Sequence, residues 1–236
     1  MKPVAIIRHS PTEGPGHFAT FLERNSLPWE LIRIDAGDAL PTTPERFSGL
    51  CLMGGPMSVN DELPWIPPLL DLIRLTMASN RPVIGHCLGG QLMSKALGGS
   101  VTRNPVKEIG WQPVSIVESP TAHEWLGDMT SFESFHWHGE TFTIPAGAVR
   151  ILQSGACTNQ AFVLGKHLGM QCHVEMTAEM IREWYRSGVE EIDACGAQLT
   201  VQRPEDMEVN IEARLMALNA AAERLYSHLI KGLIHE

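Results

Sequence analysis

The sequence predicts an α/β fold, a doubly wound, mostly parallel sheet with helices on both faces and a small antiparallel extension. Over the first hundred residues, short apolar runs alternate with stretches of helical periodicity, which is typical of a parallel sheet. After Gly99, strand-like runs follow one another without long helices, and this indicates the antiparallel part. The chain has 236 residues, which is enough for one α/β domain with a large core.

The first half of the chain contains four predicted strands that alternate with predicted helices. Buried strands are predicted where short apolar runs end at or near Gly or Pro. These runs are residues 4–9, 29–35, 49–55 and 82–86. Helices are predicted where apolar residues recur at helical spacing, at residues 17–25, 65–80 and 88–99. Strands that alternate with helices imply that neighbouring strands run parallel.

The second half begins with strands and ends with a helix. The strand-like runs are residues 110–118, 133–142, 148–155, 160–165 and 168–175. Near the C-terminus, apolar residues recur along one face of a long helix: Ile211, Leu215, Leu218, Ala222, Leu225, Leu229 and Leu233. We interpret this face as packing on the domain's own core, with a dimer or partner interface as the alternative. Residues 1–236 are therefore predicted to form a single domain with a helical C-terminal extension at about 190–236.

Charge and cysteine content exclude several classes of protein. With 18 basic and 27 acidic side chains the net charge is −9, which argues against nucleic acid or an anionic membrane as a partner. The five cysteines are odd in number and form no C-x-x-C motif, so neither a disulfide framework nor a zinc site is predicted. No signal-peptide core and no stretch near the ~20 apolar residues of a membrane span occurs. We therefore expect a cytoplasmic protein.

A cysteine lies between glycines where a predicted strand meets a predicted helix. Residues 85–89 read Gly-His-Cys-Leu-Gly, the form of the G-x-S-x-G nucleophile elbow with Cys87 in place of serine. The glycines permit a tight turn, and the start of the helix places partial positive charge beside the sulfur, which favours a thiolate. The amide of Leu88 is a natural oxyanion donor. The alternative is a small buried cysteine in an ordinary strand-to-helix turn.

A thiol nucleophile needs a base and a group that orients the base. His173 and Glu175 are two residues apart in the segment 168–175, so on an extended chain both side chains point to one side, while Cys172 points to the core. The carboxylate could then hold the imidazole tautomer that faces the thiol. Gly54 and Gly55, after the third strand, could supply a second oxyanion donor.

In this order, the motifs resemble those of the class I, or triad, glutamine amidotransferases. The resemblance rests on Gly-Gly-Pro after a strand, then G-x-C-x-G-x-Q, then H-x-E after a run of strands. The segments IGWQPV at 109–114, FHWHGETF at 135–142 and CTNQAF at 157–162 are similar to the GMP synthase-like subgroup of that family. The motifs span roughly residues 45–180. The resemblance implies a flavodoxin-like α/β fold and an enzyme that hydrolyses the side-chain amide of glutamine.

The resemblance also implies a role for each matching residue. Cys87 would be the nucleophile, His173 the general base and acid, and Glu175 the group that orients the imidazole. The amides of Gly55 and Leu88 would form the oxyanion hole. The expected substrate contacts are Gly54, Gln91, Trp137, His138 and Gly139.

Several positions depart from the family pattern or compete with it. Val174 stands where the family usually has Pro, a change that the chemistry tolerates. His86 is a rival base, but adjacent residues of a strand point to opposite faces, so we expect it to point away from the thiol. Glu140 replaces a commoner Asp. The His136-x-His138 pair could suggest a metal, but no third ligand is evident, so no metal site is expected.

The function that we favour is a glutaminase that forms glutamate and ammonia through a cysteinyl γ-glutamyl thioester. The ammonia would pass to an unidentified acceptor or to a separate synthetase partner. No cofactor is expected, and no G-x-x-x-x-G-K-[ST] phosphate loop occurs. Two alternatives remain, a free-standing hydrolase or transpeptidase of γ-glutamyl conjugates or peptides, and a non-catalytic module that binds a small molecule or regulates a partner. A homodimer is left open.

Overall fold

Nine strands form one sheet in the computed structural model, which describes residues 1–234. The strand order is β2-β1-β3-β4-β9-β8-β7-β5-β6. The parallel half consists of β2 (Trp29–Arg33), β1 (Val4–Arg8), β3 (Gly49–Leu52), β4 (Val83–His86) and β9 (His167–Met170). The antiparallel half consists of β8 (Ala161–Leu164), β7 (Val149–Ser154), β5 (Val101–Ile116) and β6 (Ser131–Phe142). The predicted doubly wound sheet with an antiparallel extension is confirmed.

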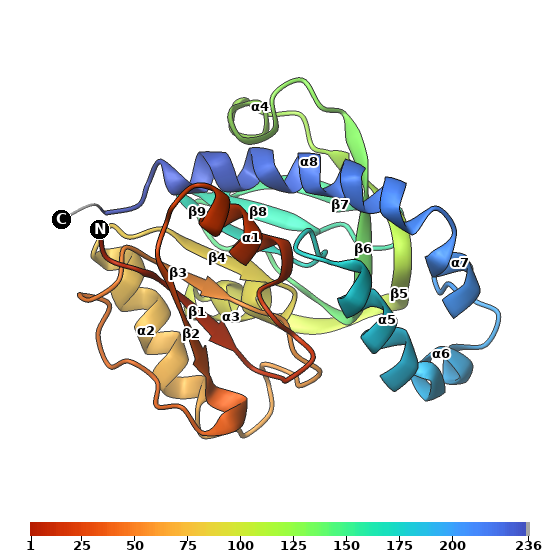
Figure 1. Cartoon of the computed structure of the whole chain (residues 1–236), viewed down its shortest axis with the longest axis horizontal. Helices are drawn as coiled ribbons and strands as arrows, with labels where there is room; N and C mark the ends of the chain where they lie inside the picture. The colour runs from red at the N-terminus through yellow and green to blue at the C-terminus, as the bar shows by residue number, and fades with distance from the viewer. Residues whose placement is uncertain (235–236) are drawn as a thin grey trace.

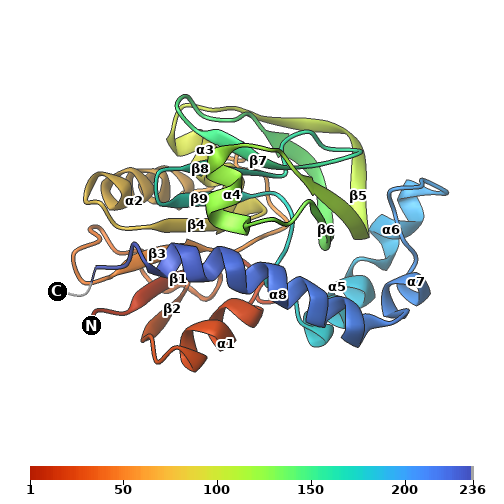
Figure 2. The same cartoon turned by 90° about the horizontal axis from the view of Figure 1, so that it is seen from above.

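Helices cover both faces of the sheet (Figure 2). On one face lie α1 (Gly16–Arg24), α4 (Pro120–Leu126) and α8 (Ile211–Ile230), and on the other lie α2 (Ile66–Ala78) and α3 (Leu88–Ala96). Alternate residues of β1 serve the two layers, because Ile6 packs with α1 and α8 while Ile7 packs with α2 and α3. Burial on both faces explains why β1, β3 and β4 read as short, almost uninterrupted apolar runs.

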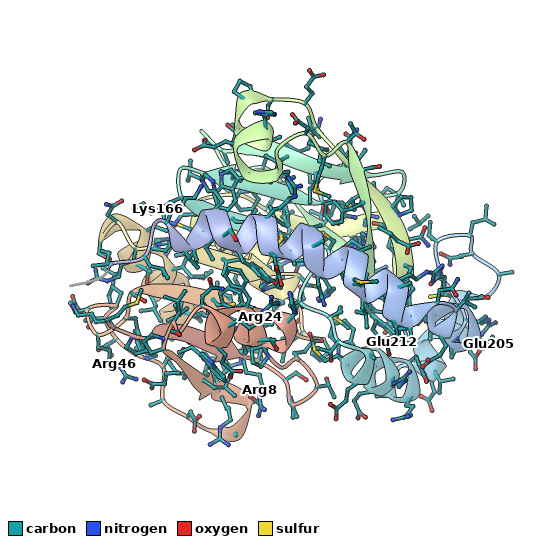
Figure 3. The ribbon with its side chains drawn as sticks, turned by 45° about the horizontal axis from the view of Figure 1, so that its top comes forward. Arg8, Arg24, Arg46, Lys166, Glu205 and Glu212 are labelled. Atoms are coloured by element: carbon teal, nitrogen blue, oxygen red, sulfur yellow. The ribbon has the colours of Figure 1, made fainter. Side chains whose placement is uncertain are left out.

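The long C-terminal helix packs on the core of the same chain. Its predicted apolar face is buried at every position from Ile211 to Leu233, and its residues join the core on the α1 side of the sheet. The helix crosses the molecule above the central strands (Figure 1). Arg24 on α1 also reaches toward it (Figure 3) and donates a 2.7 Å hydrogen bond to Glu223. The interpretation that this face packs internally is therefore confirmed.

The bounds of two predicted strands differ most from those in the structure. β5 begins at Val101, nine residues before the predicted start, and its pairing with β6 shifts register between Arg103 and Glu108. Pro105, next to Asn104, is typical of turns, and it obscured this half of the strand. The predicted strand 168–175 is also wrong at its end, since β9 stops at Met170 and the following residues form only one isolated bridge.

Several short helices were not predicted. α4 begins at Pro120 and is capped by Ser119, whose side chain accepts a hydrogen bond from the Ala122 amide. Helices α5 (Ala178–Ser187), α6 (Val189–Cys195) and α7 (Pro204–Glu208) connect the strands to α8 and form an arm at one end of the molecule (Figure 1). Ser119 and Thr177, the N-cap residues of α4 and α5, are the sequence signals that could have indicated these two helices. None of the helices in residues 1–234 has the length and apolarity that a membrane crossing requires.

Candidate active site

Cys87 occupies the sharp turn between β4 and α3. Its backbone has φ +49° and ψ −107°, a conformation that costs a non-glycine residue about 1–3 kcal/mol. The side chain is 7% exposed and lines a cavity of about 1000 Å³. Loops that follow parallel strands meet at the carboxyl edge of a sheet, so the turn lies beside the loops after β1, β3 and β9. The predicted elbow geometry is therefore present.

The glycines around Cys87 are required by close backbone packing. A Cβ atom on Gly85 would lie 2.5 Å from the carbonyl oxygen of Gly89. On Gly89 it would lie 2.8 Å from the carbonyl carbon of Leu52 in β3. Real Cβ atoms do not approach backbone atoms this closely. Helix α3 can therefore lie close against β3 only because this residue has no side chain.

We expect Gly89→Ala to destabilise the protein by about 1–3 kcal/mol or more, because the added methyl overlaps backbone that cannot move aside. Gly155→Ala is the matched control, since a Cβ there would meet no atom within 4 Å among residues 1–234 apart from those of the adjacent residues. Urea unfolding followed by circular dichroism measures both changes. Equal stability of the two variants would contradict the packing explanation.

His173 and Glu175 form a buried pair next to this turn. The His173 Nδ1–H donates to Glu175 Oε1 over 2.7 Å, and both side chains are at most 1% exposed. The backbone amide of His173 donates to the Phe135 carbonyl of β6 over 2.8 Å, which fixes the segment although it is not a sheet strand. The Nε2 atom is buried and makes no hydrogen bond within residues 1–234.

The charged forms of His173 and Glu175 stabilise each other. Burial lowers the pKa of His173, but the Glu175 carboxylate and the neighbouring Cys87 sulfur outweigh burial and hold that pKa well above its usual value. Burial likewise raises the pKa of Glu175, but the two histidines beside it, His86 and His173, lower it to about 2. An imidazole with a carboxylate on one nitrogen and a thiol near the other can take up and return a proton.

His86 lies on the far side of Glu175. Its Nε2 is 3.3 Å from the Tyr226 hydroxyl and 3.8 Å from Glu175 Oε2, while its Nδ1 is 3.9 Å from the Cys51 sulfur. Burial lowers the pKa of His86, so the ring favours its neutral form. The side chain therefore points away from Cys87, as expected, but it contacts the carboxylate of the candidate triad. Sequence reasoning missed this contact.

The two expected oxyanion donors lie side by side. A Cβ on Gly55 would be 2.8 Å from Leu88 Cδ2, and Gly55 lines the cavity together with Cys87. Leu88 is the first residue of α3, where helix amides have no partner within the helix. Gly54, expected to contact substrate, lies instead against His173, since a Cβ there would be 3.2 Å from its Cε1.

Two glutamines connect the thiol to the neighbouring strands. The Gln171 amide nitrogen is a donor 3.5 Å from the Cys87 sulfur, and its oxygen accepts from the Gln91 amide over 3.2 Å. The sulfur lies 3.9 Å from the Trp137 carbonyl. Gln91 thus lines the cavity as expected, whereas Gln171 was missed because it precedes the H-x-E motif and is not part of it.

The expected substrate segment, Trp137-His138-Gly139, lies in β6 on the cavity wall. Its histidine is held by a buried carboxylate that the sequence did not reveal. His138 Nε2 is 3.1 Å from Glu108 Oε2, and its Nδ1–H donates to the Glu140 carbonyl. Glu108 comes from β5, so only strand pairing brings it to this position.

Glu108 is also the third group beside the His136-x-His138 pair. Its two oxygens accept 2.7 Å hydrogen bonds from Ser154 and Gln160. Burial lowers the pKa of His136 to about 3, so this ring is neutral. The three ligand-type atoms lie within 4.8 Å of one another, but the 3.1 Å contact with His138 and two hydrogen bonds already account for the carboxylate. We therefore interpret the cluster as a hydrogen-bonded network that holds the cavity wall in place.

The helical arm forms the remaining wall of the cavity. The Trp184 ring of α5 packs edge-on against His173, with ring centroids 4.8 Å apart. Glu191 of α6 accepts a 2.9 Å hydrogen bond from the Trp137 indole and also pairs with Lys107. These contacts were missed because α5 and α6 were not predicted. They couple the arm both to the candidate base and to the candidate substrate segment.

Known proteins resemble this chain over most of its length. A family model described as Glutamine amidotransferase class-I matches residues 20–187. The crystal structure of a glutamine amido transferase from Methylobacillus flagellatus is 49% identical and covers 100% of this chain and 97% of its own, with a TM-score of 0.97. The glutamine amidotransferase-like protein YfeJ of Salmonella typhimurium is 31% identical over 82% of this chain and 84% of its own. The GMP synthase of Aeropyrum pernix is 28% identical over 62% of this chain, but the match spans only 28% of that protein.

Proposed function

The chain belongs to the glutamine amidotransferase class-I family of enzymes, and we propose that Cys87, His173 and Glu175 are its catalytic triad. One observation carries the proposal. A cysteine held at φ +49° between a strand and a helix lies beside a histidine whose other ring nitrogen is bound to a buried carboxylate. A merely structural cysteine has no need of a strained backbone or of an adjacent ionised pair.

The first half of the proposed reaction forms a thioester. His173 holds the thiol proton, and the Cys87 sulfur attacks the amide carbon of a γ-glutamyl group. The oxyanion of the tetrahedral intermediate accepts hydrogen bonds from the amides of Gly55 and Leu88, each worth about 2.7–4 kcal/mol in comparable sites. His173 then gives its Nε2 proton to the leaving nitrogen as the carbon–nitrogen bond breaks. The amine departs, and a γ-glutamyl thioester remains on Cys87.

The second half releases glutamate. Water gives a proton to His173 Nε2 and attacks the thioester carbon, and the sulfur leaves as a thiolate. Glu175 stays ionised throughout, because its pKa is about 2, and it holds the ring by the Nδ1–H bond. Splitting the hydrolysis into two displacements lowers each barrier relative to direct attack by water. Gln91 and the backbone of Trp137, His138 and Gly139 hold the γ-glutamyl group.

A hydrolase of larger γ-glutamyl amides is a second candidate, and the cavity favours it. Its volume of about 1000 Å³ is at the upper end for small-molecule sites and exceeds what free glutamine requires. The space continues from Cys87 toward the arm, where residues such as Ser187 and Gln198 form the wall. A conjugate could therefore place its leaving group against α5 and α6. Transfer of ammonia to a separate synthetase partner is the corresponding role if glutamine itself is the substrate.

The decisive experiment is incubation of the purified protein with glutamine and with γ-glutamyl amides and peptides of increasing size. Release of glutamate, ammonia and free amine is measured, with Cys87→Ala as the blank. We expect turnover of at least one γ-glutamyl compound. A kcat/KM at least tenfold higher for a conjugate than for glutamine would identify the second candidate. Failure of the folded wild-type protein on the whole panel would refute the proposed activity.

A further inference from the structure

A second carboxylate lies beside the candidate base, and neither the motifs nor the proposed mechanism uses it. Glu13 belongs to the loop between β1 and α1 and lines the same cavity as Cys87. As a residue it is half-buried, but its Oε2 atom is shielded from solvent and makes no hydrogen bond within residues 1–234. A buried carboxylate oxygen without a donor is costly, so its position needs an explanation.

The loop that carries Glu13 is held by a hydrogen bond on each side, one from α5 and one to the segment that carries the triad residues. The Trp184 indole donates a 2.8 Å hydrogen bond to the carbonyl of Thr12. The amide of His17 donates to the Glu175 carbonyl over 2.7 Å. A Cβ atom on Gly16 would overlap that carbonyl. The backbone on both sides of Glu13 is therefore held in place.

The side chains of Glu13 and of the candidate base, His173, both lie against Gly54. A Cβ on Gly54 would lie 2.5 Å from Glu13 Oε2 and 3.2 Å from Cε1 of His173. The Cε1 atom is bonded to Nε2, the nitrogen that gives its proton to the leaving group in the proposed reaction. The Glu13 carboxylate thus lies on the cavity wall close to the ring of the candidate base.

The electrostatic environment of Glu13 favours binding of a positively charged partner. Burial raises the pKa of Glu13 to about 7, against the opposing effect of the His173 ring and with a further rise from Glu175. A hydrogen bond to a carboxylate from a nitrogen that gains positive charge is stronger than one between neutral groups. A departing amine is such a nitrogen, because it receives the His173 proton as its bond to carbon breaks.

We propose that Glu13 is a catalytic residue that accepts a hydrogen bond from the leaving nitrogen of γ-glutamyl amides. As the carbon–nitrogen bond breaks, its electron pair goes to nitrogen, which takes the Nε2 proton of His173, and one N–H of the amine points to the Glu13 carboxylate. No bond of Glu13 is made or broken. Because the contact strengthens as the nitrogen takes the proton and gains positive charge, it stabilises the transition state more than the bound substrate. This inference rests on the proposed function.

The test compares Glu13→Gln with the wild type on two substrates of nearly the same shape. γ-Glutamyl methylamide has an N–H on its leaving atom, and glutamate γ-methyl ester has an oxygen without hydrogen there. Measured as kcat/KM at pH 8, Glu13→Gln should lose roughly 10- to 100-fold on the amide, the size expected for one charged hydrogen bond. It should change little on the ester.

Two controls separate this role from others. Glu140→Gln removes the same charge from the cavity, but its carboxylate is already bonded to Ser58, so it should not discriminate between amide and ester. The melting temperature of Glu13→Gln should equal or exceed that of the wild type at pH 8. The native pKa of this carboxyl lies above its unfolded value, so ionising it lowers stability as pH rises through about 7.

Each outcome has a definite meaning. Equal losses on amide and ester would overturn the inference and assign Glu13 to positioning His173. Unchanged rates on both substrates would overturn it as well. If the wild type hydrolyses neither compound nor any other γ-glutamyl compound, the proposed activity fails instead. The selective loss on the amide, with folding intact, is the result that supports a contact to the leaving nitrogen.

Discussion

Cys87→Ala should reduce hydrolysis of every γ-glutamyl substrate by roughly 10⁴-fold or more, since removal of a nucleophile that acts as part of a triad destroys the joint effect. A glutamine-mimicking electrophile should label the wild-type protein once, at Cys87. Initial rates of glutamate release and mass spectrometry of the labelled peptides check the two statements. Turnover retained in the variant would remove the basis of the thioester mechanism.

The other cysteines supply internal controls for the labelling. Cys51, Cys157 and Cys172 are buried, and burial raises the pKa of all three thiols, that of Cys172 to about 12. They should therefore stay unreactive near neutral pH. Cys195 also lines the cavity, but it lies in α6 and not at the elbow turn. Cys195→Ala should leave both turnover and labelling by the glutamine mimic intact, and the opposite result would redirect the assignment.

His173→Ala and Glu175→Gln should both impair turnover, but to different degrees. Loss of the imidazole removes the group that moves protons, so we expect a fall of roughly 10⁵–10⁶-fold in kcat. Glu175→Gln keeps the ring and removes only the charge that orients it, so we expect a smaller fall of about 10³–10⁴-fold. Single-turnover measurements of acylation give both values, with circular dichroism as the check on folding.

His86 is the rival candidate for the general base, and its substitution tests the assignment of His173. It contacts the same carboxylate from the far side, at 3.8 Å, and lies against Tyr226. If His86→Gln folds normally and loses as much activity as His173→Ala, the base has been assigned to the wrong histidine. A modest loss would fit a histidine that supports Glu175 without touching substrate.

Local sequence patterns were sufficient to predict a structural feature where the residues that form it are close together in the sequence. The turn at Cys87 was readable because Gly85 and Gly89 flank the nucleophile directly. The pairing of His173 with Glu175 was readable because the two lie only two residues apart and contact each other at 2.7 Å. The apolar face of α8 was readable because a helix brings every third or fourth residue to one side.

Contacts between residues that lie far apart in the sequence could not be predicted in the same way. Glu108 reaches His138 only because β5 lies antiparallel to β6, and the register between these strands shifts at an irregularity that contains Pro105. Trp184 covers His173 only because the unpredicted helix α5 folds back over the triad segment. Glu13, from the first loop of the chain, meets His173 at Gly54 through the parallel order of β1, β3, β4 and β9.

The sequence by itself determined the fold class, the elbow at Cys87 and the identity of the residues that we propose as the triad, because period, spacing and glycine placement act over a few residues. Only the tertiary structure decided which groups surround that triad: His86 behind Glu175, Gln171 beside the sulfur, and the Oε2 atom of Glu13, which has no hydrogen-bond partner among residues 1–234. The physical reason is that desolvation and electrostatic pairing depend on distances through space, and these are set by the packing of strands and helices that lie far apart along the chain.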